Sequence, residues 1–264
     1  MIRKLKVAWS FYPEDKEVLK SMLDNFFGEV KIPKINNLKA MIVPHAGYIY
    51  SGLIASYSYK ALKENLQNIW KNIFILTPDH YIWMNKVLVW NYDKLETPFW
   101  ELNTNKDIIN DLLSRDDIFT DEFLNIEKEH ALETQLPFLK YILQEKSDDF
   151  NIIPLIFWQV DVLKISSILE KYKDNSFFII SSDLSHYKNY DEAIETDKKS
   201  IEIILNKNLN KIWEIDACWI YPIATISLIA YKYNWNTKLL KYLNSWDTAW
   251  DKNHVVWYSS IIYN

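Results

Sequence analysis

Apolar and polar positions form two kinds of segment along the chain. Short runs in which nearly every position is apolar predict β-strands that are buried on both faces of a sheet. These runs, with two strand-like segments near the end of the chain, are residues 39–44, 71–78, 86–90, 150–157, 175–183, 238–245 and 254–262. Between them, apolar positions three or four residues apart predict amphipathic helices. These helices are expected at residues 52–66, 106–113, 131–144, 162–171, 190–205 and 223–233.

This order of elements predicts the fold class. Strands that alternate with helices are typical of α/β folds, in which helices cover a parallel or mixed sheet. We therefore expect a single α/β domain over residues 1–264, with a central mixed, mostly parallel sheet flanked by helices. A chain of 264 residues is long enough to bury a core of this kind.

Charge and composition argue against a nucleic-acid-binding, membrane-spanning or secreted protein. The net charge is −5 and no basic stripe is present, which argues against nucleic acid as a partner. No uncharged run reaches the roughly 18 residues that a membrane-spanning helix needs, and the first residues lack the apolar core of a signal peptide. The single cysteine, Cys218, rules out an internal disulfide and fits a reducing compartment. We therefore expect a cytoplasmic protein that makes no membrane contact.

Three of the five histidines share one setting. His45, His80 and His186 each follow shortly after a predicted buried strand. Ligands in open α/β sheets bind at the carboxyl ends of the strands, and imidazoles that converge there suit a transition metal. Cys218, which precedes a predicted helix, could add a thiolate. The alternative is three unrelated loop histidines, each hydrogen-bonded to a backbone carbonyl.

Two further polar residues are candidates for roles beside such a site. His130 stands in EHALETQLPFL between Glu129 and Glu133. It either hydrogen-bonds a ligand or gates a pocket, or it packs and caps the helix that begins there, and both readings stay open. Asp183 shares a loop with His186, where it acts as a base or orients an imidazole through the second ring nitrogen; we favour orientation.

Two of the three glycines lie beside His45, in the stretch IVPHAGYIYSG at residues 42–52. Pro44 and Gly47 predict a tight turn after the strand, with Gly47 allowing the backbone to pass close to whatever His45 binds. Gly52 is expected where the following helix begins against the sheet.

Nine segments together resemble the Memo family, which is also called AmmeMemoRadiSam system protein B. They occur in the family's order and span nearly the whole chain. The segments are VAWSFYP (7–13), VPHAGYIYSG (43–52), TPDHY (77–81), ETPFWEL (96–102), EHALETQLPFL (129–139), SSDLSHY (181–187), ACWIYPI (217–223), NSWDTAWD (244–251) and VVWY (255–258).

This resemblance implies a fold similar to that of the class III extradiol dioxygenases. It also implies a metal site built from His45, His80, His186 and Cys218, with iron or copper as the expected metal and zinc as the alternative. On this basis we expect metal-dependent redox chemistry. The first alternative is a non-catalytic module that binds a peptide or carries a metal on the same scaffold, and the second is a closed zinc site of structural value only.

The resemblance adds roles for the residues around the metal. Asp183 belongs to the pocket, and Asp183 and Cys218 are the candidate catalytic residues. Phe11 and Tyr50 match aromatic positions that line the pocket, and His130 is expected nearby. The ligand is an unknown small molecule or peptide. The family name implies AMMECR1-like and radical-SAM proteins as partners.

The counts of glycine and tryptophan are abnormal. A domain of this length has about 18 glycines at the average frequency, whereas this chain has 3, with 12 tryptophans. Against related sequences, tryptophan occupies glycine positions at Trp9, Trp100, Trp219, Trp246 and Trp257, and by the same pattern at Trp83, Trp158 and Trp250, with Trp235 as a further candidate. A single methylene too many in a packed core costs about 1–3 kcal/mol. We therefore interpret these positions as UGA codons that specify glycine, the alternative being a core repacked around tryptophan.

Overall fold

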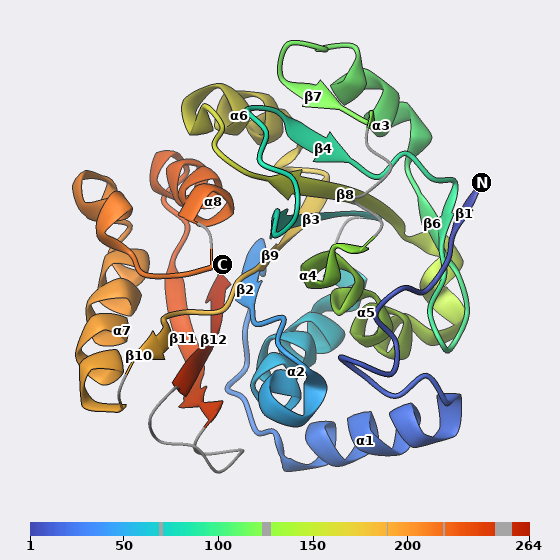
Figure 1. Cartoon of the computed structure of the whole chain (residues 1–264), viewed down its shortest axis with the longest axis horizontal. Helices are drawn as coiled ribbons and strands as arrows, with labels where there is room; N and C mark the ends of the chain where they lie inside the picture. The colour runs from blue at the N-terminus through green and yellow to red at the C-terminus, as the bar shows by residue number, and fades with distance from the viewer. Residues whose placement is uncertain (69–70, 123–127, 189, 219, 246–254) are drawn as a thin grey trace.

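The computed structural model of the protein describes residues 1–68, 71–122, 128–188, 190–218, 220–245 and 255–264 (Figure 1). Its strands are β1 (Ile2–Arg3), β2 (Ala40–Val43), β3 (Asn72–Pro78), β4 (Val87–Val89), β5 (Lys94–Leu95), β6 (Leu102–Thr104), β7 (Phe119–Thr120), β8 (Asn151–Phe157), β9 (Ser176–Ser181), β10 (His186–Lys188), β11 (Thr237–Asn244) and β12 (Val255–Tyr263). These strands form one sheet, with the order β1-β5-β6-β8-β3-β9-β2-β12-β10 along its main path.

Helices cover this sheet on both faces (Figure 1). They are α1 (Lys16–Glu29), α2 (Tyr48–Asn65), α3 (Lys106–Leu113), α4 (His130–Glu133), α5 (Gln135–Leu143), α6 (Val162–Leu169), α7 (Tyr190–Leu205) and α8 (Ile220–Lys232). Short 3-10 turns are η1 (Leu66–Asn68), η3 (Gln144–Asp149), η4 (Glu170–Tyr172) and η5 (Leu209–Glu214). In the part of the chain that the structure describes, no helix combines the length and the apolar character needed to cross a bilayer.

The sheet is parallel at its centre. Neighbouring strands β8, β3, β9 and β2 all pair in parallel, and β12 continues the sheet beyond β2 in the antiparallel direction. The predicted α/β fold with a mixed sheet is thus confirmed. Because the four central strands point the same way, their carboxyl ends lie along one edge of the sheet, where the loops that follow them meet.

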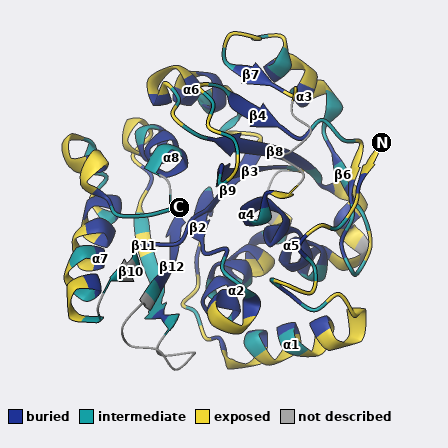
Figure 2. Cartoon of the chain, viewed as in Figure 1, coloured by how far each residue is buried: buried dark blue, intermediate teal, exposed yellow. Residues whose placement is uncertain are grey.

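Two apolar cores lie on opposite faces of this sheet, because successive side chains of a strand point to opposite sides. In β3, Ile73 and Ile75 belong to the core under α1, α2 and α5, whereas Phe74 and Leu76 belong to the core under α3, α6 and α8. The central strands are therefore buried on both faces, while the helices keep exposed outer surfaces (Figure 2). This double burial explains why the strands are uninterrupted apolar runs.

The prediction for Gly52 was wrong. Helix α2 begins at Tyr48, so that Gly52 lies one turn inside it, and Gly47 is the N-cap with a negative φ of −51°. A Cβ at position 52 would lie 2.4 Å from Cε2 of Phe26 on α1. Gly52 therefore serves the close approach of two helices, and Gly47 occupies a conformation open to other residues.

The single helix expected at residues 131–144 is divided into α4 and α5 at Thr134. Proline has no N–H to donate, and its ring clashes with the carbonyl four residues earlier. Pro137 would meet the carbonyl of Glu133 in this way, and Glu133 is the last residue of α4. The proline therefore accounts for the break.

The tryptophans at proposed glycine positions fall into two groups. Trp9 has a φ of 74°, in the left-handed region that favours glycine, and 86% of its surface is exposed. Trp83 and Trp100 are also exposed, and the half-buried Trp158 stacks on Trp83 with the ring centroids 5.7 Å apart. Among these four, Trp9 has the backbone conformation that a side chain disfavours.

The second group consists of two buried tryptophans. Trp257, on β12, is buried and stacks on Tyr242 of β11, with a centroid distance of 4.4 Å. Trp235 is also buried. The remaining positions lie outside the described residues: Trp219, Trp246 and Trp250.

Candidate metal centre

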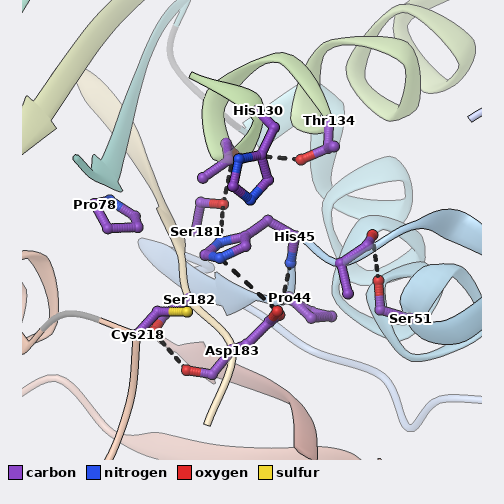
Figure 3. Close-up of polar contacts among 12 residues, drawn as sticks. Pro44, His45, Ser51, Pro78, His130, Thr134, Ser181, Ser182, Asp183 and Cys218 are labelled. Atoms are coloured by element: carbon purple, nitrogen blue, oxygen red, sulfur yellow. Dashed lines mark hydrogen bonds and ion pairs between the residues drawn. The ribbon is translucent and has the colours of Figure 1, made fainter. Parts of the chain in front are cut away.

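Three adjacent parallel strands deliver polar side chains to one edge of the sheet. His45 follows the last residue of β2 by two positions, His80 follows that of β3 by two, and Asp183 follows that of β9 by two. Since β3, β9 and β2 are neighbours in the sheet, their loops bring these residues together. Figure 3 shows His45 between Ser181 on one side and Asp183 on the other.

His45 is the buried centre of the group. Its backbone N–H donates to Asp183 Oδ1 at 2.8 Å, and its Nδ1 lies 3.0 Å from Ser181 Oγ. Its Nε2 is buried and makes no hydrogen bond within the described residues, although Asp183 Oδ2 lies 3.8 Å away. Burial, reinforced by the nearby imidazoles of His80 and His130, holds the pKa of His45 well below its usual range. The ring is therefore neutral, and a neutral ring is what a metal requires.

The carboxylate of Glu129 holds both the backbone and the ring of His80 in place. The fully buried carboxylate of Glu129 accepts the backbone N–H of His80 at 2.8 Å and lies 3.0 Å from His80 Nδ1. Burial by itself would lower the pKa of His80, but the hydrogen bond and charge of Glu129 outweigh it, so the pKa is raised. Burial would raise the pKa of Glu129, and the hydrogen bond with His80 lowers it overall. Both directions indicate an ionised Glu129.

His130, the first residue of α4, completes a group of three imidazoles. Its ring centroid lies 4.5 Å from that of His80 and 5.5 Å from that of His45. One ring nitrogen of each of these histidines lies within 4.8 Å of the others. Phe11 stacks on the His130 ring with a centroid distance of 4.5 Å. Burial lowers the pKa of His130, so this ring is also neutral near pH 7.

A second donor group shares His45. Ligand atoms of His45, Asp183 and Cys218 lie within 4.8 Å of one another. The backbone N–H of Cys218 donates to Asp183 O at 3.1 Å, and Cys218 Sγ lies 3.4 Å from His186 Nε2. Burial, followed by the charge of Asp183, raises the pKa of the Cys218 thiol well above its usual range. The thiol is therefore protonated as long as no cation replaces its proton.

The structure brings most of the predicted site residues together. His45, His80, Asp183 and Cys218 all belong to the two donor groups. His186 lies on β10 and joins them through its contact with Cys218. The structure also places the ring of His130 among the imidazoles.

The two aromatic residues expected at the pocket differ in position. Phe11 covers the His130 ring. Tyr50 lies in the first turn of α2, five residues after His45, with 38% of its surface exposed.

The donor set fits a transition metal. Imidazole nitrogens and a thiolate are ligands that zinc, iron and copper accept, whereas magnesium and calcium prefer oxygen. His45 Nε2 is a buried polar atom that makes no hydrogen bond among the described residues, and His45 is the residue that belongs to both donor groups. A buried nitrogen without a partner costs free energy, and a metal ion at this point would remove that cost.

A family model and individual relatives match nearly the whole chain, and their descriptions name the same family. The sequence model of the Memo-like protein family matches residues 3–262. A "MEMO1 family protein" of Sulfurisphaera tokodaii is 34% identical over 287 aligned positions, which cover 99% of each chain. Proteins with the same description from Methanobrevibacter smithii and Sulfolobus acidocaldarius are 32% and 31% identical, over 100% and 99% of each chain.

Proposed function

The chain belongs to the Memo family, and from that premise we propose that it binds one transition metal ion, iron or copper, and supports redox chemistry with it. One observation carries this proposal: the neutral, buried His45 has an Nε2 that makes no hydrogen bond to any described group, and His45 is the residue that the two donor groups share. The alternative occupant is zinc.

We assign the ligands from the sequence and the geometry together. His45 and His80 each keep Nε2 available, because Nδ1 is engaged by Ser181 and Glu129 respectively. Cys218 supplies a thiolate once its proton is released. His186, whose Nε2 lies 3.4 Å from Cys218 Sγ, is proposed as the remaining ligand. His130 is the alternative for this position.

The bound metal would supply a redox centre with an open position for oxygen or a substrate. The protein's own residues prepare this position. Asp183 fixes the loop that carries His45 through the backbone N–H at 2.8 Å. Phe11 covers the face of His130 and keeps water from that side. Asp183 and Cys218, which share a donor group with His45, are the proposed catalytic residues; Figure 3 draws both on the side of His45 away from His130.

Metal loading and oxygen uptake test this function. Protein purified without oxygen is incubated with Fe(II), Cu(I) or Zn(II), and both the bound equivalents and the oxygen consumed in the presence of a reductant are measured. We expect about one equivalent of iron or copper and oxygen uptake that His45→Ala abolishes. Tight zinc binding without exchange would favour a closed structural site. Iron or copper binding without uptake would favour a non-catalytic binding module, and no binding of any metal would overturn the proposal.

The proposed partners follow from the family name and the chemistry. We propose a cytoplasmic protein that acts on a small molecule or peptide, in a pathway with AMMECR1-like and radical-SAM proteins. The similarity to class III extradiol dioxygenases stays a prediction from the sequence. Co-purification of the tagged protein from its own host tests the partners, and absence of both proteins would contradict this assignment.

Metal affinity is expected to depend on pH through Cys218. Because burial raises the pKa of this thiol, metal binding must displace its proton. Affinity should therefore rise by about tenfold per unit of pH above neutrality and fall as the pH is lowered. Cys218→Ser should weaken binding and lose this dependence, because a hydroxyl does not titrate in the range. Chelator competition at several pH values measures both, and an unchanged slope in the variant would remove Cys218 from the ligands.

We also propose that UGA encodes glycine in the gene for this chain. The support is the sequence pattern together with the φ of 74° at Trp9, a conformation that glycine adopts freely and other residues rarely. A tryptophan that is 86% exposed in such a turn has no packing that would repay the strain.

Peptide mass spectrometry on protein from the original host is the direct test of this recoding. We expect glycine masses in the peptides that cover Trp9, Trp100 and Trp257. In recombinant protein, Trp9→Gly should raise the free energy of unfolding by about 1 kcal/mol, since it relieves the left-handed backbone. Trp213→Gly is the control, because Trp213 is exposed and lies at no proposed glycine position. Tryptophan masses in the host peptides would refute the recoding.

A further inference from the structure

The hydroxyl of Ser181, at the end of β9, contacts three polar groups. Its Oγ lies 2.7 Å from Ala131 O, 2.9 Å from Gln135 Nε2 and 3.0 Å from His45 Nδ1. A hydroxyl has one hydrogen to donate and two lone pairs to accept with. A carbonyl oxygen can only accept, so the Ser181 hydrogen must point to Ala131 O. The other two contacts must therefore be donations to Ser181.

The orientation of the Gln135 amide agrees with this count. The Tyr59 hydroxyl donates to Gln135 Oε1 at 2.8 Å, while Nε2 donates to Pro44 O at 3.0 Å and to Ser181 Oγ. The reverse orientation would place the amide oxygen against the carbonyl of Pro44, with no hydrogen between them. Gln135 therefore donates to Ser181, and the remaining lone pair of Ser181 is left for His45.

It follows that His45 carries its proton on Nδ1. A hydrogen bond between Ser181 and His45 exists only if Nδ1 is the donor, because Ser181 has no second hydrogen. The hydrogen bonds of Glu129 give the same result at His80. Both carboxyl oxygens accept backbone N–H groups at 2.8 Å, Oε1 from Ala131 and Oε2 from His80, so the 3.0 Å contact between Oε1 and His80 Nδ1 is a further donation to Glu129. Both neighbouring imidazoles thus have their protons on the side away from the centre.

We infer that Ser181, Gln135 and Glu129 are positioning residues that set His45 and His80 in the Nδ1–H tautomer before any metal arrives. The inference rests on the proposed metal function and specifies how the site selects its ligand atoms. A neutral imidazole in water exchanges between two tautomers, and only one of them offers an Nε2 lone pair. The relay from Tyr59 through Gln135 and Ser181 removes the unproductive tautomer of His45.

The relay is buried along its whole length. Tyr59, Gln135, Ser181 and His45 are all buried, and so is Glu129. Water therefore cannot replace a lost partner without cost. Removing Ser181 leaves the Nδ1 of His45 with no acceptor at this position, so the ring is free to adopt either tautomer. Partners of this kind typically change metal affinity by about 10–100-fold.

Nitrogen NMR of the metal-free protein tests the tautomers directly. Protein carrying ¹⁵N-labelled histidine is observed at alkaline pH, where the imidazoles are neutral, with assignments from His45→Ala and His80→Ala. We expect both residues to show a protonated Nδ1 and an unprotonated Nε2. A proton on Nε2 of His45 would overturn the relay, whether or not the protein binds metal. Correct tautomers in a protein that binds no metal would instead overturn the proposed function alone.

Variants of Ser181 test the consequence for binding. Ser181→Ala should weaken Fe(II) or Zn(II) binding by about 10–100-fold and return His45 to a mixture of tautomers. Ser181→Thr keeps the hydroxyl and should restore both properties. Ser56→Ala, which removes another buried serine hydroxyl within α2, is the matched control and should change neither. Unchanged affinity in Ser181→Ala would overturn the inference, and if that variant does not fold, the tautomers of the wild-type protein still decide it.

Discussion

Replacing Glu133 by alanine is expected to lower the free energy of unfolding by about 3–5 kcal/mol, the usual effect of breaking a buried ion pair from one side. Glu133, at the end of α4, is fully buried, and Arg3 Nη1 donates to its Oε2 at 2.6 Å. Arg3 is buried as well and also lies over the ring of Trp90, 3.7 Å from its centroid. Without Glu133, the buried guanidinium of Arg3 would lose the carboxylate to which its Nη1 donates at 2.6 Å.

The same carboxylate holds the first segment of the chain. Glu133 Oε1 accepts the backbone N–H of Val7 at 3.0 Å and the Tyr12 hydroxyl at 2.7 Å, and both oxygens lie 3.1 Å from the backbone N of Lys6. Phe11 belongs to this segment and covers His130. Loss of Glu133 should therefore weaken metal binding as well as stability, since it releases one wall of the candidate centre.

Urea denaturation of metal-free protein measures the first effect. Asp149→Ala is the control, because Asp149 forms an exposed pair with Lys71 at 3.2 Å. Exposed pairs contribute about 0–1 kcal/mol, so this variant should unfold nearly as the wild type does. If Glu133→Ala lowers the free energy of unfolding by less than about 1 kcal/mol, then water reaches Arg3 and the ion pair is not shielded from solvent.

The central strands could be predicted because burial on both faces leaves an uninterrupted apolar run. Each expected strand has a counterpart with ends shifted by a few residues, although His254, at the start of the last expected strand, lies outside the described residues. Each expected helix also has a counterpart, except that the one at residues 131–144 is divided into α4 and α5. Short strands such as β5 and β6, which lie between β1 and β8, escaped prediction because two or three residues carry no periodicity.

Helix α1 also went unpredicted, although it has a recognisable start. Asp15 is its N-cap, and the side chain accepts the backbone N–H groups of Glu17 and Val18. Its buried positions, Leu19, Leu23 and Phe27, follow helical spacing. The cap and the spacing were the signals that could have located it.

The candidate site was predictable where strand order alone decides position. His45, His80 and Asp183 meet because they follow adjacent parallel strands. His130 could not be placed this way, since its position depends on how α4 packs over the sheet edge. The roles of Glu129 and Ser181 depend on individual hydrogen bonds between distant segments, and no local sequence pattern encodes those. Ser181, two residues before Asp183, and the glutamates on either side of His130 were the available hints.

His45→Ala is expected to abolish metal binding, with a loss greater than the about 100-fold seen when partners of ligands are removed. The reason is that His45 is the member common to both donor groups. Competition with a chromophoric chelator measures the affinity for Fe(II) or Zn(II), and urea denaturation checks that the variant is folded. Binding within tenfold of the wild type would contradict the assignment of His45 as the central ligand.

The variants His186→Ala and His130→Ala separate the two remaining imidazoles. His186 Nε2 lies 3.4 Å from Cys218 Sγ, a spacing that suits two ligands of one ion with bonds of about 2.1 and 2.3 Å. His130 stacks on Phe11, and its buried Nδ1 makes no hydrogen bond within the described residues, with Glu129 Oε1 3.5 Å away. We therefore expect the larger loss of affinity in His186→Ala, and a change of less than about tenfold in His130→Ala. The opposite order would assign His130 as the third imidazole and leave His186 to hold the Cys218 thiol.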